Sequence, residues 1–213
     1  MFGVITAYTD SGGVDVLGKM TSDNKRKYCE AHGYRFFEFD EKHPKDLTFG
    51  HGWMKLPLIA SVLKENPEVE WLFWIDADAI IMNYRVRLES LIDDWAYFVV
   101  GQDCNGINVG TFFIRNCRLS LDFLADVWAR GPQPGNWWTT SEQGQISYMG
   151  LMDKYRQGYS VVLNRKFNSY VHKCYPGVLH CEMYQPGDFA VHLPGLEKKE
   201  EILNALLRRV TTA

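Results

Sequence analysis

Apolar and polar residues alternate in blocks along the first half of the chain. Three short, largely apolar runs have the length of buried strands, and two segments between them repeat apolar residues with helical spacing. The runs are residues 2–8, 35–40 and 69–76, and the helical segments are residues 21–34 and 53–67. Strands that alternate with helices in this way predict right-handed βαβ crossovers and a parallel sheet.

Local signals predict where these elements begin and end. The glycine-rich segment 9–20 predicts a loop after the first strand, so we expect the first helix to begin with Thr21 or Ser22 as its N-cap. Gly33 is expected near the end of that helix. The second helix is expected to end at the Asn66-Pro67 pair.

The second half of the chain is less regular. Its patterns predict strands over residues 96–101, 109–115, 159–164 and 188–193, and helices over residues 117–130, 141–152 and 196–209. Segments 131–138 and 168–188 are expected to be loops. The second of these is long for a compact domain, which is typical of a binding or lid segment.

Composition and charge limit the class of protein. A length of 213 residues with 46% hydrophobic content predicts one domain, residues 1–213, with one core. The net charge is −3, and no run of Lys and Arg exceeds three residues, so nucleic-acid binding is not expected. Five cysteines without a CxxC spacing predict free thiols. The N-terminus does not have the charged start of a signal peptide and no apolar run is long enough to span a membrane, which predicts a cytoplasmic protein without a membrane span.

Aromatic residues make up 14% of the chain, and several fall in segments with the composition of loops. These are Trp53, Trp137, Trp138, Tyr170, Tyr175 and Tyr184. Flat rings in loops are typical of sugar-binding clefts, and tight packing between loops uses them as well. Composition leaves both interpretations open.

Two carboxylates, Asp76 and Asp78, directly follow the apolar run Trp71–Ile75. With 14 Asp in the chain, about one D-x-D pair is expected by chance, so the spacing alone carries no information. Their placement is informative, because parallel sheets bind ligands beyond the carboxyl ends of their strands. Carboxylate oxygens there favour Mg²⁺ or Mn²⁺. The alternative is a solvated strand end with an Asp as N-cap.

Four blocks of the sequence, taken in order, resemble the signature blocks of glycosyltransferase family 34. They contain WMKLPLI and EVEWLFWIDADAIIMN, then INVGTFFIRNCRLSLDFLADVWA, SEQGQISYM and FAVHLPG, and together they span about residues 53–195. The resemblance implies an α/β, single-domain GT-A fold: a Rossmann-like, mostly parallel central sheet flanked by helices, with a smaller mixed sheet on the acceptor side. Residues 1 to about 102 would form the nucleotide-binding half, and about 103–213 the sugar and acceptor half.

The resemblance also implies an activity and its cofactor. Members of the family are retaining, metal-dependent transferases that move a sugar from a nucleotide-diphosphate donor, commonly a UDP-sugar, to a carbohydrate acceptor. By this resemblance the metal ligands are Asp76, Asp78 and His192. An imidazole ligand favours Mn²⁺, with Mg²⁺ as the alternative. A single His at the end of an alternating strand is otherwise more often a hydrogen-bonded core residue.

The same resemblance assigns residues to the donor and to catalysis. Gln143 and Glu142 are expected at the donor sugar as catalytic residues, with Asp103 as a further sugar-hydroxyl candidate. The donor-binding candidates are Thr6, Ala7, Tyr8, Asp10, Lys55, Asp76, Ala77, Asn108, Gly110, Gly195 and Lys198. Several have a purely structural alternative: a helix start at Glu142, a core aromatic at Tyr8, a bulge at Gly110 and a solvated lysine at Lys198.

Two other classes of function compete with a glycosyltransferase. The first is a metal-dependent nucleotidyltransferase or phosphohydrolase, but residues 9–18, after the first strand, have two acids and no basic residue. The second is a non-catalytic sugar-binding module, which would explain the tryptophans and gives no role to Asp76 and Asp78. The sequence also leaves open that the chain is one domain of a longer protein.

Overall fold

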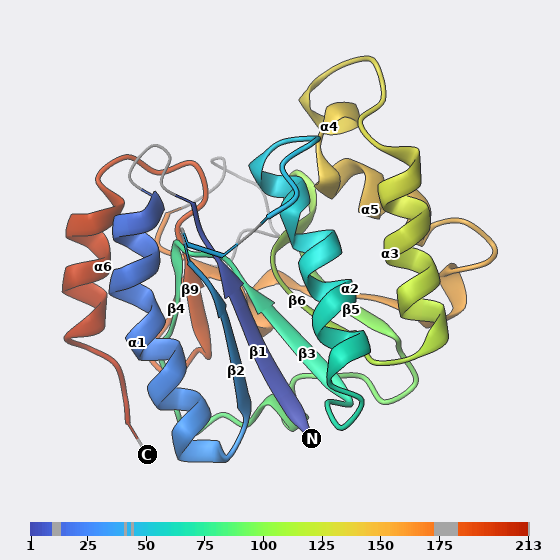
Figure 1. The fold of residues 1–213 in the computed structure, drawn as a ribbon. Helices are drawn as coiled ribbons and strands as arrows, with labels where there is room; N and C mark the ends of the chain where they lie inside the picture. The colour runs from blue at the N-terminus through green and yellow to red at the C-terminus, as the bar shows by residue number, and fades with distance from the viewer. Residues whose placement is uncertain (10–13, 41, 44, 173–182, 213) are drawn as a thin grey trace.

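A computed structural model of the chain describes residues 1–9, 14–40, 42–43, 45–172 and 183–212. Its central sheet has six strands in the order β2-β1-β3-β6-β5-β7 (Figure 1). All neighbouring pairs are parallel except those that β6 makes with β3 and β5. The strands are β1 (Phe2–Ala7), β2 (Arg35–Phe39), β3 (Trp71–Ile75), β5 (Phe98–Asp103), β6 (Gly106–Arg115) and β7 (Tyr159–Leu163). The predicted α/β fold with a mostly parallel central sheet is confirmed.

Both faces of the central sheet are covered, which explains why its inner strands are continuous apolar runs. In β3 the side chains of Leu72 and Trp74 pack into one core with α2 (Lys55–Glu65), α3 (Arg118–Arg130) and α5 (Glu142–Gly150). The alternate residues of β3 pack into a second core with α1 (Val14–His32). In Figure 1, α1 and α2 accordingly lie on either side of the strands.

The first helix starts earlier than the sequence predicts. α1 begins at Val14, so Thr21 and Ser22 lie inside the helix and the predicted N-cap is wrong. The segment looked like a loop because of its glycines, but Gly18 is in the helix where Tyr8 packs against it. A Cβ at Gly18 would lie 2.2 Å from Cγ of Tyr8, so this contact requires glycine in spite of its low helix propensity. The predicted end is confirmed, since Gly33 follows α1 with φ of 70°.

A second, three-stranded sheet has the order β4-β9-β8 and contains one antiparallel and one parallel pair. Its strands are β4 (Ala79–Ile81), β8 (Ser169–Tyr170) and β9 (Ala190–His192). Sequence patterns predict β9 but miss β4 and β8, because strands of two or three residues are too short to show a period. The smaller mixed sheet that the family resemblance implies is therefore present.

The remaining elements are short or lie at the C-terminus. Helix α4 (Trp137–Thr140) begins within segment 131–138, which is expected to be a loop, and has Asn136 as its N-cap. Helix α6 (Lys199–Leu207) lies beside α1 (Figure 1). Short 3₁₀ turns occur at His51–Met54, Leu88–Ser90, Arg156–Gly158 and Asn164–Lys166. Among the described residues, no helix is both long and apolar enough to cross a membrane. Cys29, Cys104 and Cys117 are free, whereas Cys174 and Cys181 lie outside the described residues.

Candidate active site

Backbone pairing fixes the turn from Asp76 to Asp78 between the two sheets. The amide of Asp76 donates to the carbonyl of Gly110 in β6 at 2.8 Å. On the other side, the amide of Leu193 donates to the carbonyl of Asp78 at 3.1 Å, and Ala79 pairs with His192 across β4 and β9. The short strand β4 therefore brings His192 next to Asp78, although 113 residues separate them in the sequence.

The side chains of Asp76, Asp78 and His192 form a cluster with the chemistry of a metal site. One ligand atom from each lies within 4.8 Å of the others. His192 is 3% exposed, and the two acids are partly buried. Two carboxylate oxygens and one imidazole nitrogen suit a divalent cation that takes few protein ligands. The three residues predicted as metal ligands are thus brought together, and the set fits a divalent cation.

Lys55, at the first position of α2, faces Asp76. Its Nζ lies 3.4 Å from Oδ1 of Asp76 and 3.3 Å from Oε1 of Glu142, and it donates to the carbonyl of Val109 at 3.0 Å. Burial by itself lowers the pKa of Lys55, but the two carboxylates outweigh burial and raise it above its usual value. Trp74 adds a hydrogen bond from Nε1 to Oδ1 of Asp76 at 2.6 Å. Lys55 thus links the cluster of Asp76, Asp78 and His192, called the metal cluster below, to Glu142 of α5.

Asp78 forms an ion pair with Lys199 and not with the neighbouring Lys198. Nζ of Lys199 donates to Oδ2 of Asp78 at 2.6 Å, and Nε2 of His192 lies 3.3 Å from Oδ1. Burial would raise the pKa of Asp78, but His192 and Lys199 reverse this and hold it well below its usual range. Sequence reasoning missed Lys199 because the start of α6 is not visible to within one residue.

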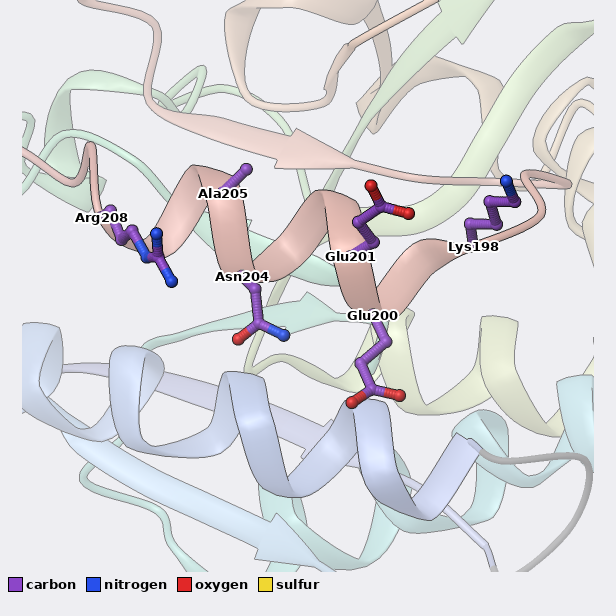
Figure 2. A pocket seen from close by; sticks show the side chains of 6 residues that line it. All are labelled: Lys198, Glu200, Glu201, Asn204, Ala205 and Arg208. Atoms are coloured by element: carbon purple, nitrogen blue, oxygen red, sulfur yellow. The ribbon is translucent and has the colours of Figure 1, made fainter.

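Lys198 lines a separate surface hollow that extends along the length of α6. Its backbone is in the left-handed region, with φ of 54°, at the N-cap of that helix. The other residues that line this hollow are Glu200, Glu201, Asn204, Ala205 and Arg208 (Figure 2). The structure therefore places Lys198 among α6 residues, and the donor contact predicted for it stays a prediction.

A third lysine, Lys25 of α1, lies fully buried beneath the acidic turn. Its Nζ donates to the carbonyl of Asp76 at 2.8 Å and to the hydroxyls of Thr6 and Thr21 at 3.1 and 3.0 Å. Burial lowers the pKa of Lys25 to about 7, although Asp76, Asp78 and Glu38 oppose that change. Three acceptors satisfy the three donors of an ammonium, so Lys25 ties β1 and α1 to the turn. No sequence motif marks Lys25.

The metal cluster opens into a cavity of about 220 Å³. Three acids and two lysines lie in its wall. The lining residues are Ala7, Leu17, His51, Gly52, Met54, Lys55, Trp74, Asp76, Ala77, Asp78, Glu142 and Lys199. Four donor-binding candidates, Ala7, Lys55, Asp76 and Ala77, therefore line one cavity. Thr6 and Tyr8 are buried, where Tyr8 donates to Glu38 at 2.7 Å, and Asp10 lies outside the described residues.

A second cavity, of about 340 Å³, is lined by β5, β6 and the start of α5. Its lining residues are Asp103, Asn105, Asn108, Trp137, Gln143, Tyr170, His172, Pro194 and Gly195. Asp103 accepts hydrogen bonds from the hydroxyl of Tyr170 and the amide of Asn105, both at 2.7 Å. Four further predicted site residues, Asp103, Asn108, Gln143 and Gly195, thus share this cavity.

Glu142 and Gln143, adjacent in the first turn of α5, face different cavities. Ser141 caps the helix by accepting from the amide of Gly144, as the sequence predicts. Glu142 lies in the first cavity with Lys55, and Gln143 lies in the second, where its Oε1 accepts from the amide of Val109 at 3.1 Å. The start of α5 therefore forms part of both cavities.

Gly110 of β6 makes room for the imidazole of His192. A Cβ at this position would lie 2.0 Å from Cε1 of His192 and 2.6 Å from Nδ1. Any side chain at Gly110 would therefore move the imidazole. The register of β5 and β6 shifts from Val100↔Phe112 to Gly101↔Asn108, so Gly110 lies in an irregularity of β6, as the bulge alternative predicts. Of the loop aromatics, Trp53 and Tyr170 are core residues, and Trp137 is 61% exposed.

A family profile settles what kind of protein this is, because it matches residues 4–96 and 92–202, almost the whole chain. The chain belongs to the galactosyl transferase GMA12/MNN10 family. This is glycosyltransferase family 34, so the family predicted from the sequence blocks is confirmed. The cluster of Asp76, Asp78 and His192 is consistent with a divalent-metal site.

Curated relatives of this family 34 chain agree in class. An uncharacterized alpha-1,2-galactosyltransferase of Schizosaccharomyces pombe is 29% identical over 89% of this chain and 66% of its own length. Galactomannan galactosyltransferase 1 of Cyamopsis tetragonoloba is 36% identical over 52% of this chain and 27% of its own. A probable xyloglucan 6-xylosyltransferase 1 of Oryza sativa is also 36% identical, over 52% of this chain and 26% of its own. The chain spans between about a quarter and two thirds of the length of these relatives.

Solved structures confirm the fold of the family 34 chain. A glycosyltransferase involved in the glycosylation of the major capsid of PBCV-1 superposes with a TM-score of 0.74 at 19% identity, over 97% of this chain and 98% of that one. The sequence also resembles a chlorovirus glycosyltransferase domain, and PBCV-1 is a chlorovirus. The galactosyltransferase LgtC superposes with a TM-score of 0.51 at 12% identity, over 100% of this chain and 97% of that one. Both likenesses support the GT-A fold.

Proposed function

We propose that this chain is a retaining, metal-dependent transferase that moves a sugar from a UDP-sugar to a carbohydrate acceptor. The observation that carries the proposal is the cluster of Asp76, Asp78 and His192, whose ligand atoms lie within 4.8 Å of one another at the carboxyl end of β3. In an α/β sheet this is the edge that binds ligands. Family membership supplies the reaction class.

The first cavity has the groups that a nucleotide diphosphate requires. Asp76, Asp78 and His192 would hold the cation, which when bound would neutralise the negative charge that develops on the leaving diphosphate. We propose Mn²⁺, because one of the three ligands is an imidazole. Lys199 contributes an ammonium at the edge of the cluster, where it can bind a phosphate oxygen.

The second cavity has the groups that a sugar requires. Asp103 and Asn105 offer an acceptor and an amide for hydroxyl groups, and Trp137 offers an exposed ring. Because Oε1 of Gln143 accepts from the amide of Val109, its side-chain NH₂ is the group that it can present to a sugar oxygen. We assign the transferred sugar and the acceptor hydroxyl to this cavity.

Glu142 and Gln143 are the proposed residues beside the reacting carbon. In the first cavity, Oε1 of Glu142 lies 3.3 Å from Nζ of Lys55, and Gln143 lines the second cavity. A sugar bound through a UDP diphosphate at the metal cluster would therefore have α5 beside it. Negative charge on Glu142 would stabilise an oxocarbenium-like centre. The retaining course is proposed from the family resemblance alone.

The names of the relatives suggest which sugars to test first. They are galactosyltransferases and xylosyltransferases, so we propose galactose or xylose as the transferred sugar. The acceptor is proposed to be a carbohydrate. Because the chain spans only part of its relatives, it is also proposed to act as one domain of a longer protein, and a cytoplasmic setting remains a proposal from its sequence.

Nucleotide binding provides the first test. The melting temperature of the chain is measured with UDP, GDP, ADP and CDP, each with Mn²⁺ and with EDTA, and hydrolysis of UDP-galactose, UDP-xylose and UDP-glucose is then followed. We expect UDP to raise the melting temperature only with Mn²⁺, and at least one donor to be hydrolysed slowly. A ligand at 100 times its Kd would stabilise the fold by about 2.7 kcal/mol.

Asp78→Asn should abolish this Mn²⁺-dependent response, and Asp153→Asn is its matched control, since Asp153 is 90% exposed and pairs with Arg156 away from both cavities. It removes one carboxylate and should leave the UDP response intact. Stabilisation by UDP that is equal in Mn²⁺ and EDTA would disprove the metal-dependent part of the proposal. Stabilisation by another nucleotide alone would disprove the donor class.

A further inference from the structure

Asn168, directly before β8, is fully buried and contacts the predicted metal ligand His192. Its Oδ1 lies 3.1 Å from Nδ1 of His192. Its Nδ2 donates to Oδ1 of Asn108 at 3.0 Å and to Oδ1 of Asn164 at 2.8 Å. Each polar atom of this side chain therefore has a partner. No sequence motif distinguishes Asn168 from the other asparagines of the chain.

The backbone decides which atom of each amide is oxygen. The amide N–H of Gly110 donates to the side chain of Asn108 at 3.0 Å, so the atom of Asn108 that it meets is the oxygen. The side chain of Asn164 in turn donates to the carbonyl of Asn168, so the other atom of Asn164 is its oxygen. Both oxygens face the same atom of Asn168, and that atom must be the NH₂ group.

The tautomer of His192 follows from this assignment. Because the NH₂ of Asn168 serves Asn108 and Asn164, the atom that faces Nδ1 of His192 is the oxygen, which only accepts. Nδ1 of His192 must then carry the proton and donate it. Nε2, which lies 3.3 Å from Oδ1 of Asp78, is left as the nitrogen that faces the acidic cluster.

We propose that Asn168 is a positioning residue that fixes His192 as the Nδ1–H tautomer with Nε2 directed to the cation. Metal-binding histidines are commonly oriented by an acceptor on the other ring nitrogen. Here the acceptor is itself oriented by β6 through Asn108, and Gly110 of the same strand leaves space for the ring. Strand β6, which lines the second cavity, thus also orients His192. This inference rests on the proposed cation site.

The test reads the tautomer directly. The chain is labelled with ¹⁵N-histidine, and long-range ¹H–¹⁵N correlation spectra are recorded without metal and with diamagnetic Zn²⁺, with the His192 signals assigned by their loss in His192→Gln. We expect a protonated Nδ1 in both states. In Asn168→Leu the preference for Nδ1–H should be lost, and Mn²⁺ affinity, measured from the EPR signal of free Mn²⁺, should fall about 10- to 100-fold.

Two further variants separate positioning from general stability. Asn168→Asp should recover most of the Mn²⁺ affinity, because a protonated carboxyl offers one acceptor and one donor in place of the amide. Asn116→Leu removes a half-buried amide that donates to the carbonyl of Leu63 at the far end of β6, and should leave Mn²⁺ affinity unchanged.

Two results would overturn the role proposed for Asn168. An unprotonated Nδ1 in the unaltered chain would overturn the proposal without any variant, even if Asn168→Leu did not fold. Unchanged Mn²⁺ affinity in a folded Asn168→Leu would also overturn it. If the unaltered chain did not bind Mn²⁺ at all, the proposed function would fail, while the metal-free spectrum would still decide the role of Asn168.

Discussion

Asp76 and Asp78 are two residues apart in one turn, yet their surroundings differ. Asp76 is held by Trp74 and Lys55, which come from the adjoining strand and from the helix before it. Asp78 is held by His192 and Lys199, which follow more than 110 residues later. The lysines differ as well, since the Lys55 side chain is 5% exposed and that of Lys199 is 23% exposed. Asp76 is therefore paired with a buried lysine, whereas Asp78 is paired with a lysine at the edge of the cavity, although the Asp78 side chain is itself the less exposed of the two acids, 16% against 29%.

This difference assigns distinct parts to the two acids. The Lys55 ammonium is enclosed by Asp76, Glu142 and the Val109 carbonyl, so it is a structural member of the core. The Lys199 ammonium can move into solvent at little cost, because it is already partly hydrated. A cation that enters the cluster should therefore displace Lys199 from Asp78 and leave Lys55 in place.

The largest expected effect is that of Asp78→Asn on cation binding. The variant replaces a charged ligand with a neutral amide, so Mn²⁺ affinity should fall by more than about 100-fold and Mn²⁺-dependent UDP binding should be lost. The fold should be kept, because the amide of Asn has the shape of the carboxylate and its oxygen can still accept from Nζ of Lys199. Isothermal titration with Mn²⁺ and then UDP measures both steps, and unchanged affinity would mean that the pair is only a solvated strand end.

Lys55→Met should act on stability instead. It leaves the carboxylates of Asp76 and Glu142 close together without their shared cation, and the carbonyl of Val109 without its donor. We expect the free energy of unfolding to fall by about 3 kcal/mol, near the lower end for a broken buried pair, since both acids keep some exposure. Urea unfolding of the metal-free chain measures this. A loss below about 1 kcal/mol would show that the two lysines are equivalent.

The contrast between the two acids also explains what the sequence could reveal. The network around Asp76 is largely local, so the apolar run of β3, its two acids and the helix with Lys55 were all predictable. His192 was found through its family block and not through its spacing. Lys199, Lys25 and Asn168 could not be found, because each acts through a contact that exists only after α1, α6 and β8 are packed.

The same limit applies to the elements themselves. Gly18 was predicted to lie in a loop, although it is in α1. A glycine is required there because the ring of Tyr8 packs against it, and the sequence pattern does not show that contact. Strand β4 has three residues, too few for a period, and its pairing with β9 is what brings Asp78 to His192. Fold class and the acidic pair were therefore predictable, whereas the completion of the site depended on tertiary packing.

Gly110→Ala should weaken cation binding by His192 and Asp78 without disturbing the contacts of Asp76. Its Cβ would fall 2.0 Å from Cε1 of His192, so the imidazole must move away from the cluster. We expect Mn²⁺ affinity to fall about 10-fold, the lower end of the range for a disturbed metal ligand. The ion pair of Lys55 with Asp76 should survive, so stability should change far less than in Lys55→Met. Equal losses of stability in the two variants would argue that both sides of the turn form one rigid unit.

Lys199→Met is expected to have the smallest effect and the opposite sign. Because the ammonium of Lys199 competes with a cation for Oδ2 of Asp78, its removal should raise Mn²⁺ affinity without nucleotide by about fivefold. That is the equilibrium equivalent of the roughly 1 kcal/mol that a partly exposed ion pair contributes.

Lys198→Met removes the same charge one residue away, in the hollow on α6 shown in Figure 2, and does not touch Asp78. It should leave Mn²⁺ affinity unchanged within about twofold, since a charge that is well exposed to solvent is screened.

With UDP present the effect of Lys199→Met on Mn²⁺ affinity should reverse, because the ammonium of Lys199 that the cation displaces from Asp78 then binds phosphate. If Lys199→Met weakened Mn²⁺ binding even without UDP, Lys199 would be holding Asp78 in position, and the two acids would have the same kind of support.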